Sequence, residues 1–465
     1  MKVQQLYTNC LAQGAYYISH NGEAAIIDPL RETQPYLDLL KKNNDKLKYI
    51  FETHFHADFV SGHVDLAKAT GAKIIFGPDA ETSYNSYVAK DGEEFKLGGL
   101  TFKVLHTPGH TMESSSFLLL DENKQPHCIF TGDTLFIGDV GRPDLAIKSD
   151  LTQNDLAGML YDSLRNKIMP LPDHVIVYPA HGAGSACGKN MSKETFDTLG
   201  NQKKINYALQ NITKEQFIKE LTTGIAPPPS YFSKNALLNK KGYKNYDDVI
   251  RSGAKPLNVS EFEKAMNDQK ILILDVRKPE EFTEAYIPGS LFIGLDGQFA
   301  PWVGTVINDL NTPILVIAPS GREEETVMRL SRVGYDNCIG YLEGGFASWK
   351  NSGKATESLP NINAEQYVEL YRKGITTLDV RKLGEYEANR LTDTSNVPLD
   401  FIYDWVNNLD KEKKYYINCA GGYRSVIAAS IMKMNGYKNL VNVAGGFGAI
   451  ARTGIETCTK ACKNS

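Results

Sequence analysis

Two stretches in the second half of this 465-residue chain repeat one another, and this repeat limits the fold more than any other feature. Ile273-Leu-Asp-Val-Arg277 recurs as Thr377-Leu-Asp-Val-Arg381, and Gly344-Gly-Phe346 recurs as Gly445-Gly-Phe447. In each copy a short apolar strand runs through a loop into an expected helix. Strands that alternate with helices favour a parallel α/β sheet. We therefore expect each copy, about a hundred residues long, to form a complete small domain.

Length and composition set the broad class. A chain of 465 residues predicts about three domains, and 42% hydrophobic with 23% charged residues is typical of globular proteins. The net charge of −4 does not show the excess of basic residues that is typical of nucleic-acid-binding domains. No signal peptide and no apolar run of the ~18 residues that cross a bilayer is apparent. We expect a cytoplasmic protein with small-molecule partners, bound neither to nucleic acid nor to a membrane.

Composition also separates the chain into parts. The first part mixes apolar strands with helical stretches at 62–70 and 192–221, and is followed by TGIAPPPSYF, whose three prolines favour extended polyproline geometry. Seven cysteines are an odd number, which argues for free thiols in a reducing compartment rather than a disulfide framework. We predict a first domain, a Pro-containing linker and two repeat domains, at 1–224, 225–257, 258–356 and 357–465.

All nine histidines lie at or before position 181. Thr53-His-Phe-His-Ala-Asp58 follows the apolar strand YIFET, and three similar pieces follow other predicted strands: His106-Thr-Pro-Gly-His110, Thr131-Gly-Asp133 and Tyr178-Pro-Ala-His181. Loops on a rigid scaffold can bring such side chains together. Because four strand ends all carry imidazole or carboxylate, they predict a metal site rather than isolated packed histidines.

This pattern resembles the metallo-β-lactamase superfamily, and we therefore expect an αββα sandwich. In its two-metal members, such as glyoxalase II, the residue after Asp58 is a histidine, whereas this chain has Phe59. Loss of an imidazole weakens a second site, so we expect one metal ion. The resemblance narrows to persulfide dioxygenases, whose iron ligands match His54, His110 and Asp133, the two-histidine, one-carboxylate set of non-haem iron oxygenases. It implies one Fe(II) per chain.

The resemblance also assigns supporting roles. It implies that His56, Asp58 and His181 orient the metal ligands or water, or bind metal directly if the centre is dinuclear. Arg142, within Gly141-Arg-Pro-Asp144, is expected to bind or orient an anionic substrate, with an ion pair to the nearby aspartate as the alternative.

A second constellation lies near the C-terminal end. Cys419-Ala-Gly-Gly-Tyr-Arg424 follows the strand YYIN and precedes a predicted helix that stops at Gly436. Backbone N–H groups, the helix dipole and the Arg424 charge would all lower the pKa of this thiol. The loop resembles the rhodanese active loop, which implies that Cys419 and Arg424 are catalytic. It also implies that the intervening residues bind substrate: Gly421, Gly422 and Tyr423.

The first repeat has Ala318 where Cys419 stands in the second, within Ala318-Pro-Ser-Gly-Arg-Glu-Glu-Glu325. Alanine cannot carry a sulfur atom and three glutamates would repel an anionic substrate, so we expect a silent domain. In the second repeat, residues 389–396 replace the usual Gly-His-Ile-Pro-Gly stretch of rhodaneses, which leaves its substrate entrance undefined. The roles of three cysteines stay open: Cys187, near the metal or buried and inert, and Cys458 and Cys462, expected as surface or tail thiols that could resolve a persulfide.

The whole chain resembles a persulfide dioxygenase fused to an inactive and an active rhodanese domain, an arrangement of bacterial sulfide detoxification. This implies oxidation of a low-molecular-weight persulfide by O2 to thiol and sulfite, with sulfur transfer between persulfide, sulfite and thiosulfate through Cys419. Glutathione, coenzyme A, cysteine and bacillithiol are all candidate thiols, and homo-oligomer formation stays open. Two alternatives are a dinuclear-zinc thioester hydrolase of glyoxalase II type fused to a sulfurtransferase, and a sulfur relay with a non-catalytic metal domain.

Overall fold

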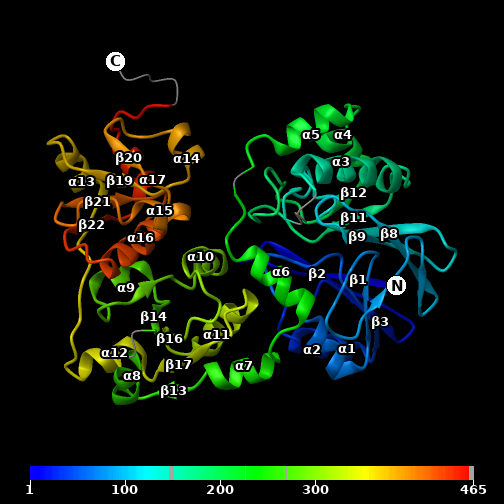
Figure 1. The fold of residues 1–465 in the computed structure, drawn as a ribbon, viewed down its shortest axis with the longest axis horizontal. Helices are drawn as coiled ribbons and strands as arrows, with labels where there is room; N and C mark the ends of the chain where they lie inside the picture. Colours follow the sequence, from blue (N-terminus) through cyan, green and yellow to red (C-terminus); the bar gives the residue numbers. More distant parts are fainter. Residues whose placement is uncertain (146–150, 226, 268–269, 460–465) are drawn as a thin grey trace. The chain divides into compact units, whose positions relative to one another are not determined.

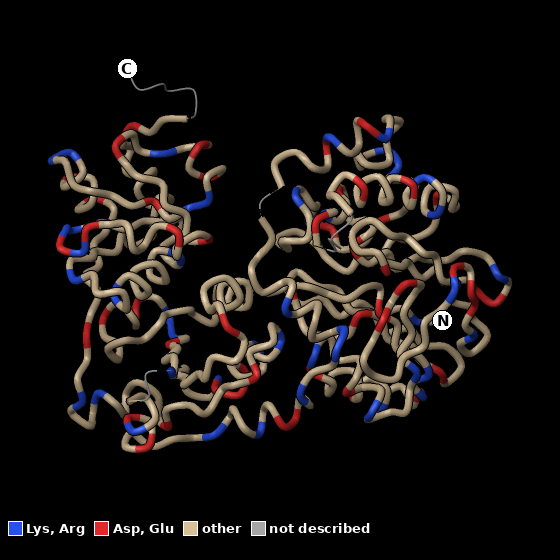
Figure 2. The backbone as a smooth tube through the Cα atoms, viewed as in Figure 1, with Lys and Arg blue, Asp and Glu red and all other residues tan. Residues whose placement is uncertain are grey.

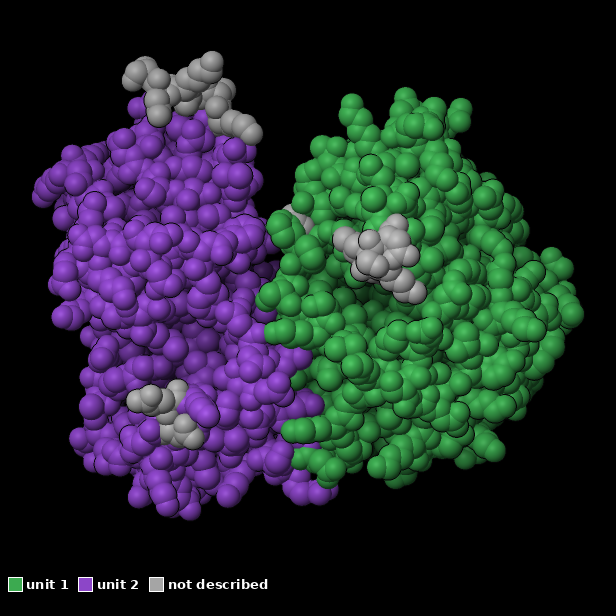
Figure 3. Space-filling model, viewed as in Figure 1, with its two compact units in different colours: residues 1–248, 331–334 green, residues 249–330, 335–465 purple. Residues whose placement is uncertain are grey.

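The computed structural model (Figure 1) describes residues 1–145, 151–225, 227–267 and 270–459. They divide into two compact units, coloured separately in Figure 3: Met1–Asp248 with Ser331–Gly334, and Val249–Leu330 with Tyr335–Ser465. Within the described ranges, no helix is both long and apolar enough to cross a membrane.

Unit 1 contains two six-stranded sheets with helices on their outer faces (Figure 1), so the expected αββα sandwich is confirmed. The first sheet has the order β1-β2-β3-β4-β5-β6, formed by Lys2–Thr8, Gln13–His20, Glu23–Ile27, Lys46–Phe51, Lys73–Phe76 and Tyr87–Val88. The second has the order β12-β11-β10-β9-β8-β7, formed by Asp197–Thr198, Ile176–Pro179, Pro126–Gly132, Ser115–Leu120, Leu100–His106 and Glu94–Leu97.

The core between the sheets is rich in aromatic side chains. Strand β9 is buried along its whole length, as expected for a strand covered on both faces. The facing side chains come from both sheets: Tyr16, Ile18, Phe51, Phe102, Phe117 and Phe130. This packing fixes the strand ends from which the histidine loops emerge.

The outer helices each bury an apolar face on one sheet. On the first sheet lie α1 (Gln34–Asn43) and α2 (His63–Thr70); on the second lie α3 (Gln153–Ser163), α4 (Leu199–Ile205) and α5 (Lys214–Thr222). A π-helical turn, Leu164–Ile168, follows α3, and a 3₁₀ turn, Tyr207–Leu209, follows α4.

The predicted helical stretch at 192–221 is interrupted, and capping residues explain why. Asn206 is extended and its side chain accepts from the Ala208 N–H, while Thr213 and Gln216 form a capping box that starts α5. Such side chains satisfy free backbone N–H groups and so begin new helices.

Two helices lie within 225–257, where the sequence predicted a linker. Helix α6 (Phe232–Lys241) belongs to unit 1, and α7 (Tyr246–Gly253) follows it. This segment therefore contributes packed structure to the first unit and does more than connect.

The second unit contains two five-stranded parallel sheets of the same topology, so the α/β repeat predicted from the sequence is confirmed. One has the order β13-β17-β16-β14-β15, formed by Pro256–Leu257, Cys338–Leu342, Ile314–Ile317, Leu272–Asp275 and Leu291–Phe292. The other has the order β18-β22-β21-β19-β20, formed by Asn361–Ile362, Leu440–Val443, Tyr415–Asn418, Thr377–Asp379 and Thr394–Asn396.

Helices alternate with these strands. Those of the first copy are α8 to α12: Val259–Met266, Pro279–Glu284, Phe299–Val306, Glu323–Arg332 and Gly345–Asn351. Those of the second are α13 to α17, with a 3₁₀ turn at Leu399–Phe401: Ala364–Tyr371, Leu383–Ala388, Ile402–Trp405, Tyr423–Met434 and Gly446–Arg452.

The two repeated motifs contact one another, which explains why they recur together. In the second copy, Arg381 donates to Asp379 at 2.6 Å and its guanidinium lies 3.8 Å from the centroid of the Phe447 ring. In the first copy, the corresponding distances are 2.6 Å between Arg277 and Asp275, and 4.0 Å to the ring of Phe346. An arginine held between a carboxylate and an aromatic face ties the end of one strand to the helix that follows another.

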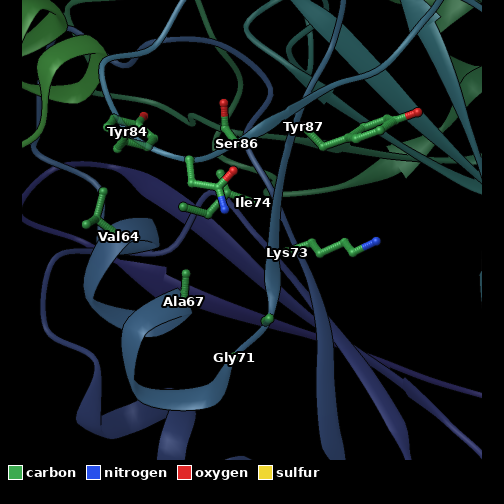
Figure 4. Close-up of a pocket in the computed structure, with 10 residues that line it drawn as sticks. Val64, Ala67, Gly71, Lys73, Ile74, Tyr84, Ser86 and Tyr87 are labelled. Carbon is green, nitrogen blue, oxygen red and sulfur yellow. The ribbon is translucent and has the colours of Figure 1, made fainter.

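Lysine and arginine are interspersed with aspartate and glutamate along the chain in both units (Figure 2). A pocket of about 490 Å³ lies beside α2 (Figure 4). It is lined by ten residues, none of them a predicted site residue: Val64, Ala67, Gly71, Ala72, Lys73, Ile74, Tyr84, Asn85, Ser86 and Tyr87.

Candidate metal centre and sulfur site

Three of the predicted metal ligands meet in one buried cluster of unit 1. His54 follows β4, His110 follows β8 and Asp133 follows β10, and one ligand atom of each lies within 4.8 Å of the others. The Asp133 Oδ2 atom lies 3.3 Å from Nε2 of His110 and 3.8 Å from Nε2 of His54. Their side chains are almost completely buried. The strand ends therefore converge as the sequence predicted.

The hydrogen bonds of this cluster fit a metal site. The Nδ1 of His110 lies 2.8 Å from the carbonyl oxygen of Arg142. Because a carbonyl only accepts, Nδ1 donates and Nε2 keeps its lone pair for an ion. Among the described residues, the Asp133 Oδ2 atom has no hydrogen-bond partner. A buried carboxylate oxygen without a partner is costly, and a bound cation would remove that cost.

Electrostatics favour the protonation states that metal binding needs. Burial lowers the pKa of both His54 and His110, which keeps their imidazoles neutral near pH 7. Burial opposes ionisation of Asp133, but the charge of His181 and its hydrogen bond hold the pKa of Asp133 well below the ordinary value. Two neutral imidazoles and one ionised carboxylate are the forms that bind a divalent ion.

His56 is turned away from this cluster. Its Nε2 atom lies 3.1 Å from Oδ1 of Asp28 and 3.8 Å from Oε2 of Glu52. Asp28 also accepts hydrogen bonds from the N–H and the hydroxyl of Thr53, each at 2.8 Å. His56 thus links the start of the loop at residues 53–58, the histidine loop, to Asp28. The ring centroids of His56 and His54 lie 4.2 Å apart.

Asp58 and His181 lie beside the cluster, linked to it through Asp133. The Nδ1 of His181 is 2.7 Å from Oδ1 of Asp133, and its Nε2 is 2.9 Å from Oδ2 of Asp58. Cys187 joins these two residues in a second group whose ligand atoms lie within 4.8 Å of one another. The ring of Phe59 is buried against His56.

Arg142 makes the ion pair that was the alternative to a substrate role. Its guanidinium donates to both carboxylate oxygens of Asp144, at 2.6 and 2.7 Å, and to the carbonyl of Ala186 at 3.1 Å. Its own carbonyl accepts from His110. Arg142 therefore supports the cluster, and contact with substrate stays a prediction.

In the second unit, Cys419 lies in the loop between β21 and α16. Its side chain is buried and its Sγ accepts a hydrogen bond from the Gly422 N–H at 3.1 Å. Gly422 has a φ of 97°, a conformation that favours glycine. A Cβ on Gly446 would lie 2.2 Å from the Cys419 carbonyl oxygen, so the second glycine of the repeated Gly-Gly-Phe motif lets α17 approach the loop closely.

Arg424 does not present a free positive charge to the thiol. It donates to both carboxylate oxygens of Glu385, at 2.6 and 2.7 Å. Burial opposes the charge of Arg424, but Glu385 raises its pKa, so it stays charged. Because this charge is shared with Glu385, the Gly422 N–H at 3.1 Å and the N-terminus of α16 gain importance as stabilisers of a thiolate.

The side chain of Tyr423 points into the first copy of the repeat. Its hydroxyl donates to the carbonyl of Gly294 at 2.6 Å. A Cβ on Gly297 would lie only 2.3 Å from the Tyr423 ring. The Phe292 ring packs against it with centroids 6.0 Å apart. The phenol thus anchors the loop, and substrate binding by Gly421, Gly422 and Tyr423 stays a prediction.

In the first copy, the loop that corresponds to the Cys419 loop has alanine in place of cysteine. Ala318 follows β16 and is buried. Glu325 pairs with Arg322 at 2.7 Å and with Arg329 at 2.7 Å, so the charge of this one glutamate is compensated, and repulsion of an anion by Glu323 and Glu324 stays a prediction.

The other cysteines differ in their surroundings. Cys10, Cys128, Cys187 and Cys338 are free thiols, all buried except the first. Cys458, expected as a surface or tail thiol, is buried, and its backbone pairs with Arg390 in an isolated β-bridge. Cys462 lies outside the described residues.

Family comparisons agree with this geometry. Residues 9–181 match the metallo-beta-lactamase superfamily, and residues 258–352 and 363–453 each match the rhodanese-like domain. The crystal structure of a metallo-beta-lactamase from Staphylococcus aureus is 30% identical with a TM-score of 0.65, and the match covers 74% of this chain and 98% of that one. The chain belongs to the metallo-beta-lactamase superfamily and carries two rhodanese-like domains.

Two curated relatives of the metallo-beta-lactamase domain have different names. The probable hydroxyacylglutathione hydrolase glo2 of Schizosaccharomyces pombe is 33% identical over 34% of this chain, which spans 58% of the length of that relative. The human mitochondrial persulfide dioxygenase ETHE1 is 29% identical over 44% of this chain and 74% of its own length. The comparisons thus support a metal-binding enzyme domain joined to sulfurtransferase-type domains.

Several supporting residues carry no motif in the sequence. Asn239 of α6 donates from Nδ2 to the carbonyls of His56 and Phe59, at 2.7 and 2.8 Å, and accepts from the Ser61 N–H at 2.9 Å. It thereby closes the loop that carries the first histidines, from a segment predicted to be a linker. Contacts so distant in sequence leave no periodic or spacing signal.

Replacing Asn239 with alanine should destabilise unit 1 and weaken metal binding. Two buried carbonyls and one buried N–H would lose their partners, at a cost of about 3 kcal/mol. Thermal unfolding and metal content measure the two effects. Asn235→Ala is the matched control, because Asn235 is equally buried on α6 but its amide has no hydrogen-bond partner among the described residues. Equal losses in the two variants would show that the hydrogen bonds of Asn239 do not matter.

Gly297→Ala should lower sulfurtransferase activity although Gly297 lies in the first rhodanese-like copy, which has Ala318 in place of Cys419. The added methyl would displace the Tyr423 ring and shift the Cys419 loop, with a loss of about tenfold or more. Steady-state thiosulfate sulfurtransferase rates measure it. In Gly384→Ala, the control, the new Cβ meets nothing within 4 Å. Full activity of Gly297→Ala would mean that the Tyr423 anchor is dispensable.

Proposed function

We propose that the protein is a non-haem Fe(II) persulfide dioxygenase coupled to a rhodanese sulfurtransferase. The observation that carries the proposal is the meeting of His54, His110 and Asp133 in one buried cluster, while His56 pairs with Asp28 instead. This leaves two imidazoles and one carboxylate, the set typical of oxygen-activating iron proteins. The likeness to a named persulfide dioxygenase supports it.

In this proposal a low-molecular-weight persulfide reacts with O2 and water to give the thiol and sulfite. Bound Fe(II) would supply the positions at which oxygen is activated next to the substrate. Two contacts orient the site. The Arg142 carbonyl accepts from Nδ1 of His110 and so fixes its tautomer, and His181 pairs with Oδ1 of Asp133, the oxygen that does not face His54 and His110. Burial of the cluster keeps water from competing with the substrate.

The sulfur-transfer half rests on Cys419. A persulfide on Cys419 reacts with sulfite by breaking its S–S bond, which releases thiosulfate and leaves the Cys419 thiolate. The Gly422 N–H, 3.1 Å from Sγ, and the N-terminus of α16 stabilise the departing thiolate. The first copy has Ala318 at this position and supplies no nucleophile.

A dinuclear-zinc thioester hydrolase is the second candidate, because a relative at 33% identity is named a probable hydroxyacylglutathione hydrolase. Against it stand Phe59, which replaces an imidazole, and the turn of His56 toward Asp28. The two candidates differ in the metal and in the consumption of oxygen.

Protein purified without oxygen should hold about one iron per chain at the His54 cluster. His110→Ala and Asp133→Ala should each lose the iron and the oxygen uptake with glutathione persulfide together. Metal analysis and an oxygen electrode measure these losses, with His174→Ala, an exposed histidine outside the cluster, as the control. Two zinc ions with thioester hydrolysis, or iron retained in Asp133→Ala, would contradict the assignment.

Cys419→Ser should abolish sulfur transfer from thiosulfate to a thiol but leave oxygen uptake intact. Because serine cannot carry sulfane sulfur, sulfite should replace thiosulfate as the product of persulfide oxidation. The comparison is with Cys338→Ser, which removes a buried thiol of the silent copy. If Cys419→Ser also stops oxygen uptake, Cys419 delivers persulfide to the iron and the order of steps is reversed.

A further inference from the structure

The charge beside Cys419 is set by residues outside its loop. Arg424 supplies the one positive charge of the loop, and it donates to both carboxylate oxygens of Glu385 at 2.6 and 2.7 Å. Burial opposes ionisation of Glu385, but the hydrogen bond from Arg424 holds its pKa below the ordinary value, so this carboxylate is ionised near pH 7. A two-pronged pair of this kind compensates the charge that an anionic substrate would need.

Glu385 is held in place independently of Arg424. Its carboxylate also accepts from the backbone N–H of Lys382 at 3.1 Å, at the N-terminus of α14. Such a hydrogen bond holds a glutamate side chain against the first turn of its own helix. Pairing with Arg424 therefore requires little further ordering of the Glu385 side chain.

The first copy shows that the fold does not require this pairing. Glu281 of α9 accepts from the backbone N–H at the start of its helix at 3.1 Å, as Glu385 does in α14. Arg322 of the first-copy loop, however, pairs with Asp296 and Glu325, at 2.6 and 2.7 Å. The cap at the start of the helix is thus common to both copies. The contact between this glutamate and the loop arginine is a feature of the copy that carries the thiol.

A second carboxylate adds negative charge at the same place. Asp400 lies in the 3₁₀ turn that precedes α15, and its Oδ1 atom is 3.7 Å from Nζ of Lys382, whose side chain is 64% exposed. An exposed ion pair at this distance is weak. Oδ2 of Asp400 is buried without a hydrogen-bond partner among the described residues. Burial opposes the charge of Arg424, Glu385 raises the pKa of Arg424 most, and the charges of Cys419 and Asp400 add to that increase. An approaching dianion therefore meets no net positive charge.

Exposed apolar side chains lie in the two segments that carry these carboxylates. Leu383, which is 57% exposed, belongs to the first turn of α14 together with Glu385. Phe401, which is 44% exposed, directly follows Asp400. Apolar groups next to a reactive group favour contact with the carbon chain of an organic substrate, which an inorganic anion lacks.

We propose that Cys419 takes its sulfur from an organic persulfide, R–S–SH, in preference to thiosulfate, and that Glu385 sets this preference by compensating the charge of Arg424. The inference rests on the proposed sulfur-transfer function and adds the class of donor. The reacting end of an organic persulfide carries at most one negative charge, whereas thiosulfate is a dianion. A site without net positive charge therefore favours the persulfide.

The transfer needs no external oxidant. The Cys419 thiolate attacks the outer sulfur of the donor, the bond between the two donor sulfurs breaks, and the outer sulfur passes to Cys419 with its proton. The thiolate R–S⁻ leaves and takes a proton from water. The same charge balance favours release of thiosulfate after sulfite has accepted the sulfur, because the dianionic product is held weakly.

Loading of Cys419 in the full-length protein, with oxygen excluded, tests the preference. The reduced protein is mixed with glutathione persulfide or with thiosulfate, and mass spectrometry of the alkylated Cys419 peptide follows the gain of one sulfur atom. Exclusion of oxygen prevents the iron centre from consuming the persulfide. We expect glutathione persulfide to load Cys419 about tenfold faster than thiosulfate, or more.

Glu385→Gln removes the charge but keeps an oxygen for the Lys382 N–H, so α14 should stay intact. It should raise the rate with thiosulfate about tenfold and change the rate with glutathione persulfide less than about threefold. The gain should shrink as salt is added, because salt screens the uncovered charge of Arg424. Glu281→Gln, which changes the same cap in the first copy, is the matched control and should alter neither rate. Asp400→Asn, in a different segment, should act in the same direction as Glu385→Gln.

Equal loading by the two donors in the native protein would overturn the preference. Thiosulfate rates unchanged in both Glu385→Gln and Asp400→Asn would overturn its electrostatic cause. Failure of both donors to load Cys419 would refute the sulfur-transfer function on which the inference rests. Because oxygen uptake plays no part in the assay, the dioxygenase assignment is tested separately.

Discussion

The Asp133 carboxylate is the group on which the first unit depends. It is buried among three imidazoles: one oxygen faces His54 and His110, and the other pairs with His181. An ionised carboxylate in such a place is stable only while positive or hydrogen-bonding partners surround it. The loops after four strands must therefore meet at this point, and the two aromatic-rich sheets hold them there.

The second unit depends on a comparable local constraint that occurs twice. In each copy an arginine pairs with the aspartate that ends a central strand and stacks on the phenylalanine of the Gly-Gly-Phe turn. This contact fixes the turn beneath the loop that follows the neighbouring strand. It is present in the copy with Ala318 as well as in the copy with Cys419, because it supports the fold of each.

Periodicity and spacing predicted much of this organisation. The two parallel sheets and the helix after Cys419 follow from strand-like apolar runs, the repeat and the position of Gly436, whereas the αββα sandwich was expected from the resemblance to the metallo-β-lactamase superfamily. The meeting of His54, His110 and Asp133 could be expected because each follows a strand. His56 shows the limit: the same motif supplies it, but Asp28 and Glu52, whose importance no spacing indicates, decide where its ring points.

The contacts that escaped sequence analysis are those made by ordinary polar side chains over long distances in the chain. Asn239 closes the histidine loop from about 180 residues away, and Glu385 takes the charge of Arg424 from another helix. The case of Tyr423 is similar, since only the folded structure shows that its hydroxyl reaches Gly294 of the first copy. The first copy, which has Ala318 in place of a cysteine, therefore still positions the Cys419 loop, because the buried Tyr423 phenol anchors that loop to it.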